Sequence, residues 1–114
     1  MLKGLGAIGD MAKMMKAATE MQSRLAEVQA GLARMVVIGE AGAGLVKARV
    51  TAKGDVTGLD IDPSILVASE KEVVEDLILA AIHDAQAKAK ARSEEEMAKL
   101  AESLGMPPGM KLPT

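Results

Sequence analysis

The stretch from Gly39 to Leu66 constrains the fold of this chain more than any other part of the sequence. It opens with a cluster of glycines, which permits the positive φ angles of a tight turn. Apolar and polar side chains then alternate, with Val46, Ala48 and Val50 on one face and Lys47, Arg49 and Thr51 on the other. This period of two predicts a half-buried antiparallel strand.

Two further strands are expected beside this one. The β-branched run at 35–38 predicts the first, and the turn sequence Lys53-Gly54-Asp55 leads into the third. In the third strand we expect Thr57, Leu59 and Ile61 on one face, and Val56 and Asp60 on the other. Asp62-Pro63-Ser64 ends the strand, because proline cannot donate a hydrogen bond to a ladder. The sequence thus predicts a three-stranded antiparallel sheet over residues 35–61.

Residues 10–34 are predicted to form a long helix, because apolar side chains recur at heptad spacing. The members of this heptad seam are Met11, Met14, Ala18, Met21, Leu25, Val28, Leu32 and Met35. Such a seam has to be covered by another helix, from the same chain or from a second copy. Lys16, Glu20 and Arg24 step by four residues and are expected to form ion pairs on another face. Residues 1–9 are expected to be flexible.

A second helical region is predicted over residues 69–104. Ser69 and Glu72 have the spacing of a capping box at its start. Apolar side chains follow at helical intervals as far as Ala85. Beyond that point, residues 85–92 are alanine-rich and basic, which favours a helix but offers little to a core.

The end of this region has two features of its own. Ser93 begins a second Ser-x-x-Glu sequence, which allows a break into two helices. Gly105 is a natural C-terminal cap, and prolines follow closely. Residues 105–114 are therefore expected to form an irregular tail.

The chain contains no Phe, Tyr, Trp or Cys. Its core must be built from aliphatic side chains and methionine, which bury less area than aromatic rings do. Two long helices and a small sheet then make a weak core in isolation, so we expect pairing with a second copy. Without aromatic rings, the base stacking used by most RNA and single-strand binders is excluded. Without cysteine, disulfides and thiolate chemistry are excluded.

The length of 114 residues fits a single domain spanning 1–114. No apolar run approaches the length of a membrane span, so no membrane contact is expected. The N-terminal sequence lacks the continuous apolar stretch and cleavage site of a secretory signal. We therefore expect a cytoplasmic protein.

Catalysis has little support in this sequence. The single histidine, His83, stands beside Asp84, and the pair could serve as acid and base. A lone histidine on a helix, at the boundary between its buried and exposed faces, explains it better. Asp60 and Asp62 could hold a cation, but a strand end followed by a turn-forming aspartate is the simpler interpretation. We expect no enzyme activity, cofactor, metal or small-molecule substrate.

The formal net charge of −2 gives no overall attraction to nucleic acid. The charge of individual stretches differs from this overall value. Residues 41–54 contain three cations and no anion, as do residues 85–93, and lysines outnumber acids near the N-terminus. A dimer doubles each cationic stretch, and phosphate binding responds to such local potentials.

The sequence resembles the YbaB/EbfC family of bacterial nucleoid-associated proteins over nearly its whole length. The central block GEAGAGLVKARV carries the resemblance most specifically, and IDPSIL matches the family's strand exit. GLGAIGDMAKMMKAATEMQ resembles the opening helix, EVVEDLILAAIHDAQAKAK the closing helix, and residues 105–113 the proline-containing tail. One departure is His83, which stands where the family usually has Asn.

The resemblance implies an α+β homodimer with the sheets at its centre and long helices projecting like the arms of tweezers. The residues expected in the seam, at the dimer contact or in the core, are Met14, Met21, Leu25, Val28, Val46 and Val50.

The resemblance also implies a nucleoid-associated protein that binds double-stranded DNA. Expected contacts are Lys13, Lys16 and Arg24 on the first helix and Lys88, Lys90 and Arg92 on the second, with Lys3 as a further candidate. Lys47 and Arg49 could instead line the dimer's sheet surface. Phosphate neutralisation would be the main mechanism, with little base readout.

A protein–protein adaptor is the alternative function. In that hypothesis the methionine-rich heptad seam captures a helix from a partner protein. A dimer that hides the seam from solvent would count against it, and an exposed apolar groove would support it.

Overall fold

The structure, a computed structural model, describes residues 2–105 of the chain, with side chains from Ile8 onward. The elements in order are helix α1 (Leu2–Arg34), strands β1 (Val36–Ala41), β2 (Val46–Thr51) and β3 (Val56–Ile61), the short 3-10 helices η1 (Pro63–Ile65) and η2 (Ala68–Glu70), and helix α2 (Lys71–Ser103). The strands form one antiparallel sheet in the order β1-β2-β3. The predicted α+β class, with a three-stranded sheet between two long helices, is confirmed.

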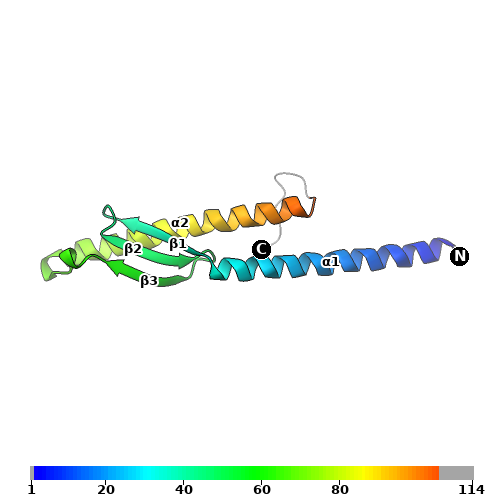
Figure 1. Ribbon diagram of the computed structural model, residues 1–114, viewed down its shortest axis with the longest axis horizontal. Coiled ribbons are helices and arrows are strands. Elements are labelled where there is room, and N and C mark those ends of the chain that lie inside the picture. The colour runs from blue at the N-terminus through cyan, green and yellow to red at the C-terminus, as the bar shows by residue number, and fades with distance from the viewer. Residues whose placement is uncertain (1, 106–114) are drawn as a thin grey trace.

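The molecule is long and thin. Figure 1 shows α2 lying along the sheet, while α1 leaves the sheet and runs antiparallel to α2 and past its end. The principal extents are 83 × 23 × 17 Å, and the radius of gyration is 21.9 Å. A compact domain of this length would have a radius of gyration of about 13 Å. Much of α1 therefore lies away from the rest of the chain.

Strand β2 is the centre of the small core. The side chains of Val46, Ala48 and Val50 are fully buried, as the alternating pattern predicted. They pack against Ala81, Ala85 and Ala89 of α2, which are also buried. Helix α2 thus supplies half of this cluster, and two of its members come from the alanine-rich segment at 85–92, contrary to the expectation that this segment offers little to a core. Small side chains are what allow the helix to lie close to the sheet.

Gly39 marks the closest approach of α2 to β1. A Cβ atom at this position would lie 2.2 Å from the backbone nitrogen of Ala85 and 2.5 Å from the backbone oxygen of Ala81. Real Cβ atoms do not come that near to other backbone atoms. Only glycine is therefore compatible with the observed contact between strand and helix.

The glycine cluster makes the β1–β2 turn as predicted. Gly42, Ala43 and Gly44 all have positive φ, at 64°, 54° and 89°. The amide of Leu45 donates to the carbonyl of Gly42 at 3.2 Å and closes the turn. Glycine adopts this left-handed conformation without steric cost, whereas Ala43 adopts it at some cost.

The predicted faces of β3 are partly wrong. The register pairs Ile61 with Val46 and Leu59 with Ala48, as expected for one apolar face. An irregularity between Arg49 and Val50 then shifts the register, so that Val56 lies opposite Val50. The hydroxyl of Thr57 donates to the carbonyl of Arg49 at 3.2 Å instead of continuing the alternation. A bulge of this kind reverses the expected orientation of the side chains beyond it.

Several helix boundaries also differ from those predicted. Helix α1 begins at Leu2 rather than at residue 10, so residues 2–9 are helical. Helix α2 follows a 3-10 turn and begins at Lys71, and its cap residue, Glu70, makes no side-chain capping bond. The predicted capping box at Ser69 is therefore absent from this helix start.

The far end of α2 agrees better with the prediction. The helix runs without interruption through Ser93, so the allowed break does not occur. Gly105 has φ of 75°, and its amide donates to the carbonyl of Glu102 at 3.0 Å, as a C-terminal glycine cap does. Residues 106–114 of the expected tail lie outside the described residues.

The heptad seam packs against α2 over only part of its length. Met21, Leu25 and Val28 lie around Leu100 and Ala101 of α2, together with Met97 and Leu104. Leu32 is 3% exposed. Earlier in the helix, Met11 and Met14 are 63% and 71% exposed, so the first part of the seam has no cover from the described part of the chain.

Candidate nucleic-acid interface

Three predicted contact residues, Lys13, Lys16 and Arg24, lie on the exposed part of α1. With 3.6 residues per turn, their positions fall within about 80° around the helix axis and extend about 16 Å along it. Among the residues with described side chains, none of the three forms an ion pair. The expected pairs of Glu20 with Lys16 and Arg24 are therefore not formed. These three cations are available to phosphate groups.

The predicted contact residues on α2 are in a different situation. The ammonium group of Lys88 lies 2.9 Å from the carboxylate of Asp84, and Arg92 lies 3.4 Å from that of Glu96. Lys90 is exposed, and no ion pair of its own is found within residues 8–105. Partners thus already reduce the positive potential of two of the three cations, although exposed ion pairs are weak enough to exchange.

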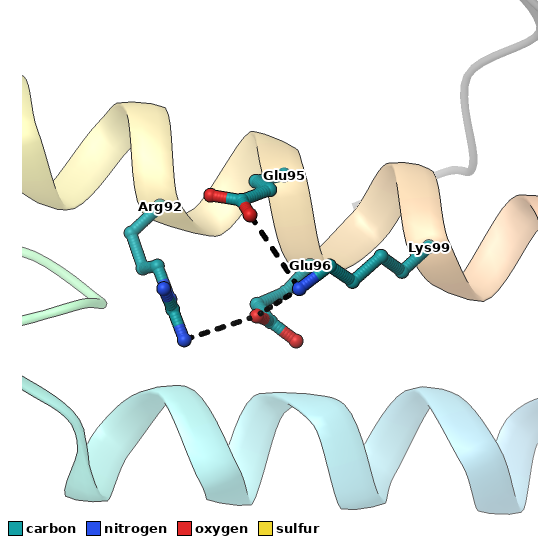
Figure 2. Close-up of polar contacts among 4 residues, drawn as sticks. All are labelled: Arg92, Glu95, Glu96 and Lys99. Atoms are coloured by element: carbon teal, nitrogen blue, oxygen red, sulfur yellow. Dashed lines mark hydrogen bonds and ion pairs between the residues drawn. The ribbon is translucent and has the colours of Figure 1, made fainter.

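Acidic side chains continue this pairing toward the end of α2. Figure 2 shows Glu96 between Arg92 and Lys99, with Glu95 also reaching Lys99. All three contacts measure 3.4 Å. The i,i+4 spacing of two of these pairs and the i,i+3 spacing of Glu96 and Lys99 are visible in the sequence. Counting cations over residues 85–93 missed this pairing because the partner carboxylates lie just beyond that range.

The outer face of the sheet carries mixed charge rather than a basic patch. In the strand register, Lys47 lies between Glu40 and Asp60, and the guanidinium of Arg49 forms an ion pair with Asp60. Lys47 and Arg49 therefore sit on the face opposite the buried valines, as the alternation predicted. Their acidic neighbours make them poor candidates for phosphate contacts.

Asp84 joins α2 to the edge of β1. Its carboxylate accepts a hydrogen bond from the backbone amide of Glu40 at 3.0 Å, and Lys88 donates to the carbonyl of Ile38 at 3.4 Å. The bond from Glu40, followed by the contacts with Lys88, holds the pKa of Asp84 below its usual value. Two polar groups at the open edge of β1 are thereby paired. The sequence shows the i,i+4 pair but not its contact with a strand some 45 residues away in sequence.

The alternative chemical sites do not assemble. Asp84 is bonded to Glu40 and Lys88, and no hydrogen bond joins it to His83 within the described residues. Asp62 accepts from the amide of Ser64 at 2.9 Å, whereas Asp60 is paired with Arg49. In the described part of the chain, no three His, Cys, Asp or Glu side chains are placed to hold a metal ion.

The low pKa of Asp84 predicts how stability responds to acid. A carboxylate with a depressed pKa stabilises the fold above its unfolded pKa, which is about 3.9, and loses that contribution as the pH falls through the folded pKa. Asp84→Asn keeps an acceptor for the Glu40 amide but does not titrate. Between about pH 4 and pH 2, thermal stability measured by far-UV circular dichroism should therefore fall less steeply in this variant than in the wild type. Asp76→Asn, on an exposed part of the same helix, should follow the wild-type profile, and parallel profiles for all three proteins would contradict the assignment.

Comparisons with known proteins point to one family. The model of the YbaB/EbfC DNA-binding family matches residues 8–104. A nucleoid-associated protein of Bradyrhizobium diazoefficiens is 47% identical, over 90% of this chain and 97% of its own length. One from Rhodopseudomonas palustris strain HaA2 is 48% identical, over 92% of this chain and 99% of its own.

A solved structure supports the fold. The crystal structure of an uncharacterized Helicobacter pylori protein, HP0035, has a TM-score of 0.57, with 18% identity over 68% of this chain and 90% of that one. Within residues 2–105, no helix combines the length and apolar composition that a bilayer span requires. The family match covers most of the sequence, including most of α1, the glycine turn, the sheet and all of α2, and the chain belongs to the YbaB/EbfC DNA-binding family.

Proposed function

We propose that this protein is a nucleoid-associated homodimer that binds double-stranded DNA mainly through phosphate contacts, organises the chromosome and influences gene expression. Its family and the names of its relatives support the DNA partner and the location in the nucleoid. The observation that carries the proposed mechanism is a set of three cations, Lys13, Lys16 and Arg24, which have no ion-pair partner among the described side chains and lie on one side of a projecting helix.

The cations of α2 contribute less to phosphate binding in this mechanism. Lys90 is the most available of them, whereas Lys88 and Arg92 must leave Asp84 and Glu96 to meet a phosphate. Exposed ion pairs contribute little stability, so the exchange costs little. Such an exchange also contributes less binding free energy than a phosphate contact made by a lysine that has no partner to leave. We therefore assign the main phosphate contacts to α1 and supporting ones to α2.

Association of two copies is supported by the small size of the core. The largest fully buried side chains are only Val46 and Val50, and most other core positions are alanines. Exposed large apolar side chains are found on α1, on the sheet and on α2. Burial of apolar area is the main stabilising term in folding, and this chain leaves much of that area in solvent. A second copy would cover part of it.

The adaptor function remains a second candidate because one observation favours it. Ile8, Met11, Met14 and Met15 are 63–71% exposed on α1, and methionine-rich surfaces accommodate varied partner helices. An adaptor would bind a partner protein through these side chains and would need no DNA.

Binding to two fluorescently labelled duplexes of equal length, one A·T-rich and one G·C-rich, tests the DNA-binding function. The label is needed because the protein has no aromatic fluorophore. Phosphate contacts carry no direct sequence information, so the two dissociation constants are expected to agree within about threefold. An absence of binding to either duplex at low salt would contradict the function. A large preference for one would contradict the phosphate mechanism and indicate base readout.

A further inference from the structure

Methionine is the only sulfur-containing residue of this chain, and it is abundant. The 114 residues include 9 methionines and no cysteine, and Trp and Tyr are also absent. Thioethers and thiols are the side-chain groups that peroxides oxidise most readily, so the methionines are the main targets that this chain offers to such an oxidant. The surroundings of each methionine then decide what its oxidation does to the molecule.

The methionines whose side chains the structure describes form two groups. Met11, Met14 and Met15 of α1 are 63%, 71% and 69% exposed, and these three are the exposed methionines. Figure 1 shows α1 running past the end of α2, so this part of the helix has no cover from the described part of the chain. A dimer with its sheets at the centre also leaves it in solvent. The other group is half-buried and consists of Met21, Met35 and Met97.

Two of the half-buried methionines help to hold the long helices together. Met21 of α1 and Met97 of α2 belong to the apolar cluster around Leu100 and Ala101, and this contact between the helices is the clasp. Oxidation converts a thioether into a polar sulfoxide, and a polar group without a hydrogen-bond partner destabilises an apolar contact. Oxidation in the clasp should therefore loosen α1 from α2. At the exposed methionines the new oxygen meets water instead.

We propose that the exposed methionines form a reversible oxidation site, which reduces hydrogen peroxide before it reaches the clasp. The thioether sulfur attacks one peroxide oxygen, and an S–O bond forms as the O–O bond breaks. The proton of the transferred oxygen moves to the departing one, which leaves as water. Methionine loses the two electrons that the peroxide gains, and methionine sulfoxide reductases, with a thiol as electron donor, restore the thioether. This inference goes beyond the proposed function and does not depend on DNA binding.

The helix geometry keeps this oxidation away from the basic side of α1. At 3.6 residues per turn, Met11, Met14 and Met15 fall within an arc of about 100° around the helix axis, and Lys13 and Lys16 each lie about 150° from the centre of that arc. Sulfoxides in the arc carry no net charge and do not enter the clasp. The fold and the phosphate contacts should therefore tolerate them.

Peptide mapping of the full chain treated with hydrogen peroxide measures the order of oxidation. Trypsin cleaves after lysine and arginine, and this places the exposed methionines, Met21 and Met97 on separate peptides. Because susceptibility follows exposure, the exposed methionines should gain oxygen about fivefold or more faster than Met21 or Met97. Equal rates at all of these positions would overturn the proposal.

A triple variant tests whether the site protects the clasp. Met11→Leu/Met14→Leu/Met15→Leu keeps apolar, helix-favouring side chains at exposed positions, so the fold should survive. With one molar equivalent of peroxide for each exposed methionine of the wild type, oxidation of Met97 should be at least about twofold greater in this variant. Met35→Leu, which removes a half-buried methionine, is the matched control and should resemble the wild type. Equal oxidation of Met97 in the triple variant and the wild type would overturn the protective role.

Enzymatic repair tests whether the oxidation is reversible. Wild-type protein oxidised at the exposed methionines is treated, while folded, with the two methionine sulfoxide reductases, one for each sulfoxide epimer. The oxidised protein should keep its helical circular dichroism, and its peptides should return to the mass of the thioether form. Sulfoxides that persist in the folded protein, or a loss of helix on oxidation of the exposed methionines alone, would overturn the proposal.

Discussion

Replacing Gly39 by alanine is expected to destabilise the protein severely. The added methyl group would lie within 2.6 Å of three backbone atoms of α2, in Ala81 and Ala85. Backbone atoms cannot rotate away as the end of a side chain can, so the helix has to move off β1. We expect a loss of more than about 3 kcal/mol, a large part of the stability of a typical small domain. Urea denaturation followed by far-UV circular dichroism measures it.

Gly31→Ala is the matched control for this substitution. Gly31 lies within α1, and a Cβ atom there would meet nothing within 4 Å apart from the adjoining backbone of its own helix. Alanine in a helix interior is more stable than glycine by about 0.5–1 kcal/mol, so this variant should be slightly stabilised. If Gly39→Ala unfolded at nearly the same urea concentration as the wild type, the contact between α2 and β1 would have to differ from the one described.

Replacing Lys13, Lys16 and Arg24 together by alanine is expected to weaken binding to duplex DNA by roughly ten- to hundredfold at moderate salt. These residues are exposed and have no ion pairs among the described side chains, so each can neutralise a phosphate. Fluorescence anisotropy of a labelled duplex measures the change. The fold should survive, because alanine favours a helix and none of the three side chains is buried.

A charge-matched variant separates contact from net charge. Lys47→Ala/Lys53→Ala/Lys71→Ala removes the same number of positive charges, from exposed positions on β2, in the turn after it and at the start of α2. It should retain most of the affinity of the wild type. A similar loss in both triple variants would mean that binding follows the overall charge and not the arm.

Local patterns in the sequence predicted the elements with regular periodicity. The alternation of Val46, Ala48 and Val50 identified the buried face of β2, and the glycine cluster identified the turn at Gly42 and Gly44. These features depend on neighbouring residues alone. The reversal at Val56 was missed because a bulge is set by pairing with another strand, which leaves no mark on the periodicity.

Contacts between distant segments were the part that the sequence could not supply. Ala89 belongs to the segment whose composition predicted little contribution to a core, yet it is buried because Gly39 lets the helix approach the sheet. Similarly, charge alone predicts that Lys88 is a free cation, but its ammonium group forms an ion pair with Asp84 beside the edge of β1. Both results depend on where α2 lies on the sheet. A list of candidate DNA contacts taken from charge alone therefore gives equal weight to cations that differ in availability.

Salt dependence of DNA binding shows whether phosphate groups contact the basic side of α1. The dissociation constants of the wild type and the Lys13/Lys16/Arg24 variant would be measured over a series of salt concentrations. For each lost contact, the slope of log affinity against log salt should become shallower by about 0.9. Such a decrease would identify these cations as the groups that displace counterions. Identical slopes for the two proteins would contradict phosphate contact by these three residues, even if the variant bound more weakly.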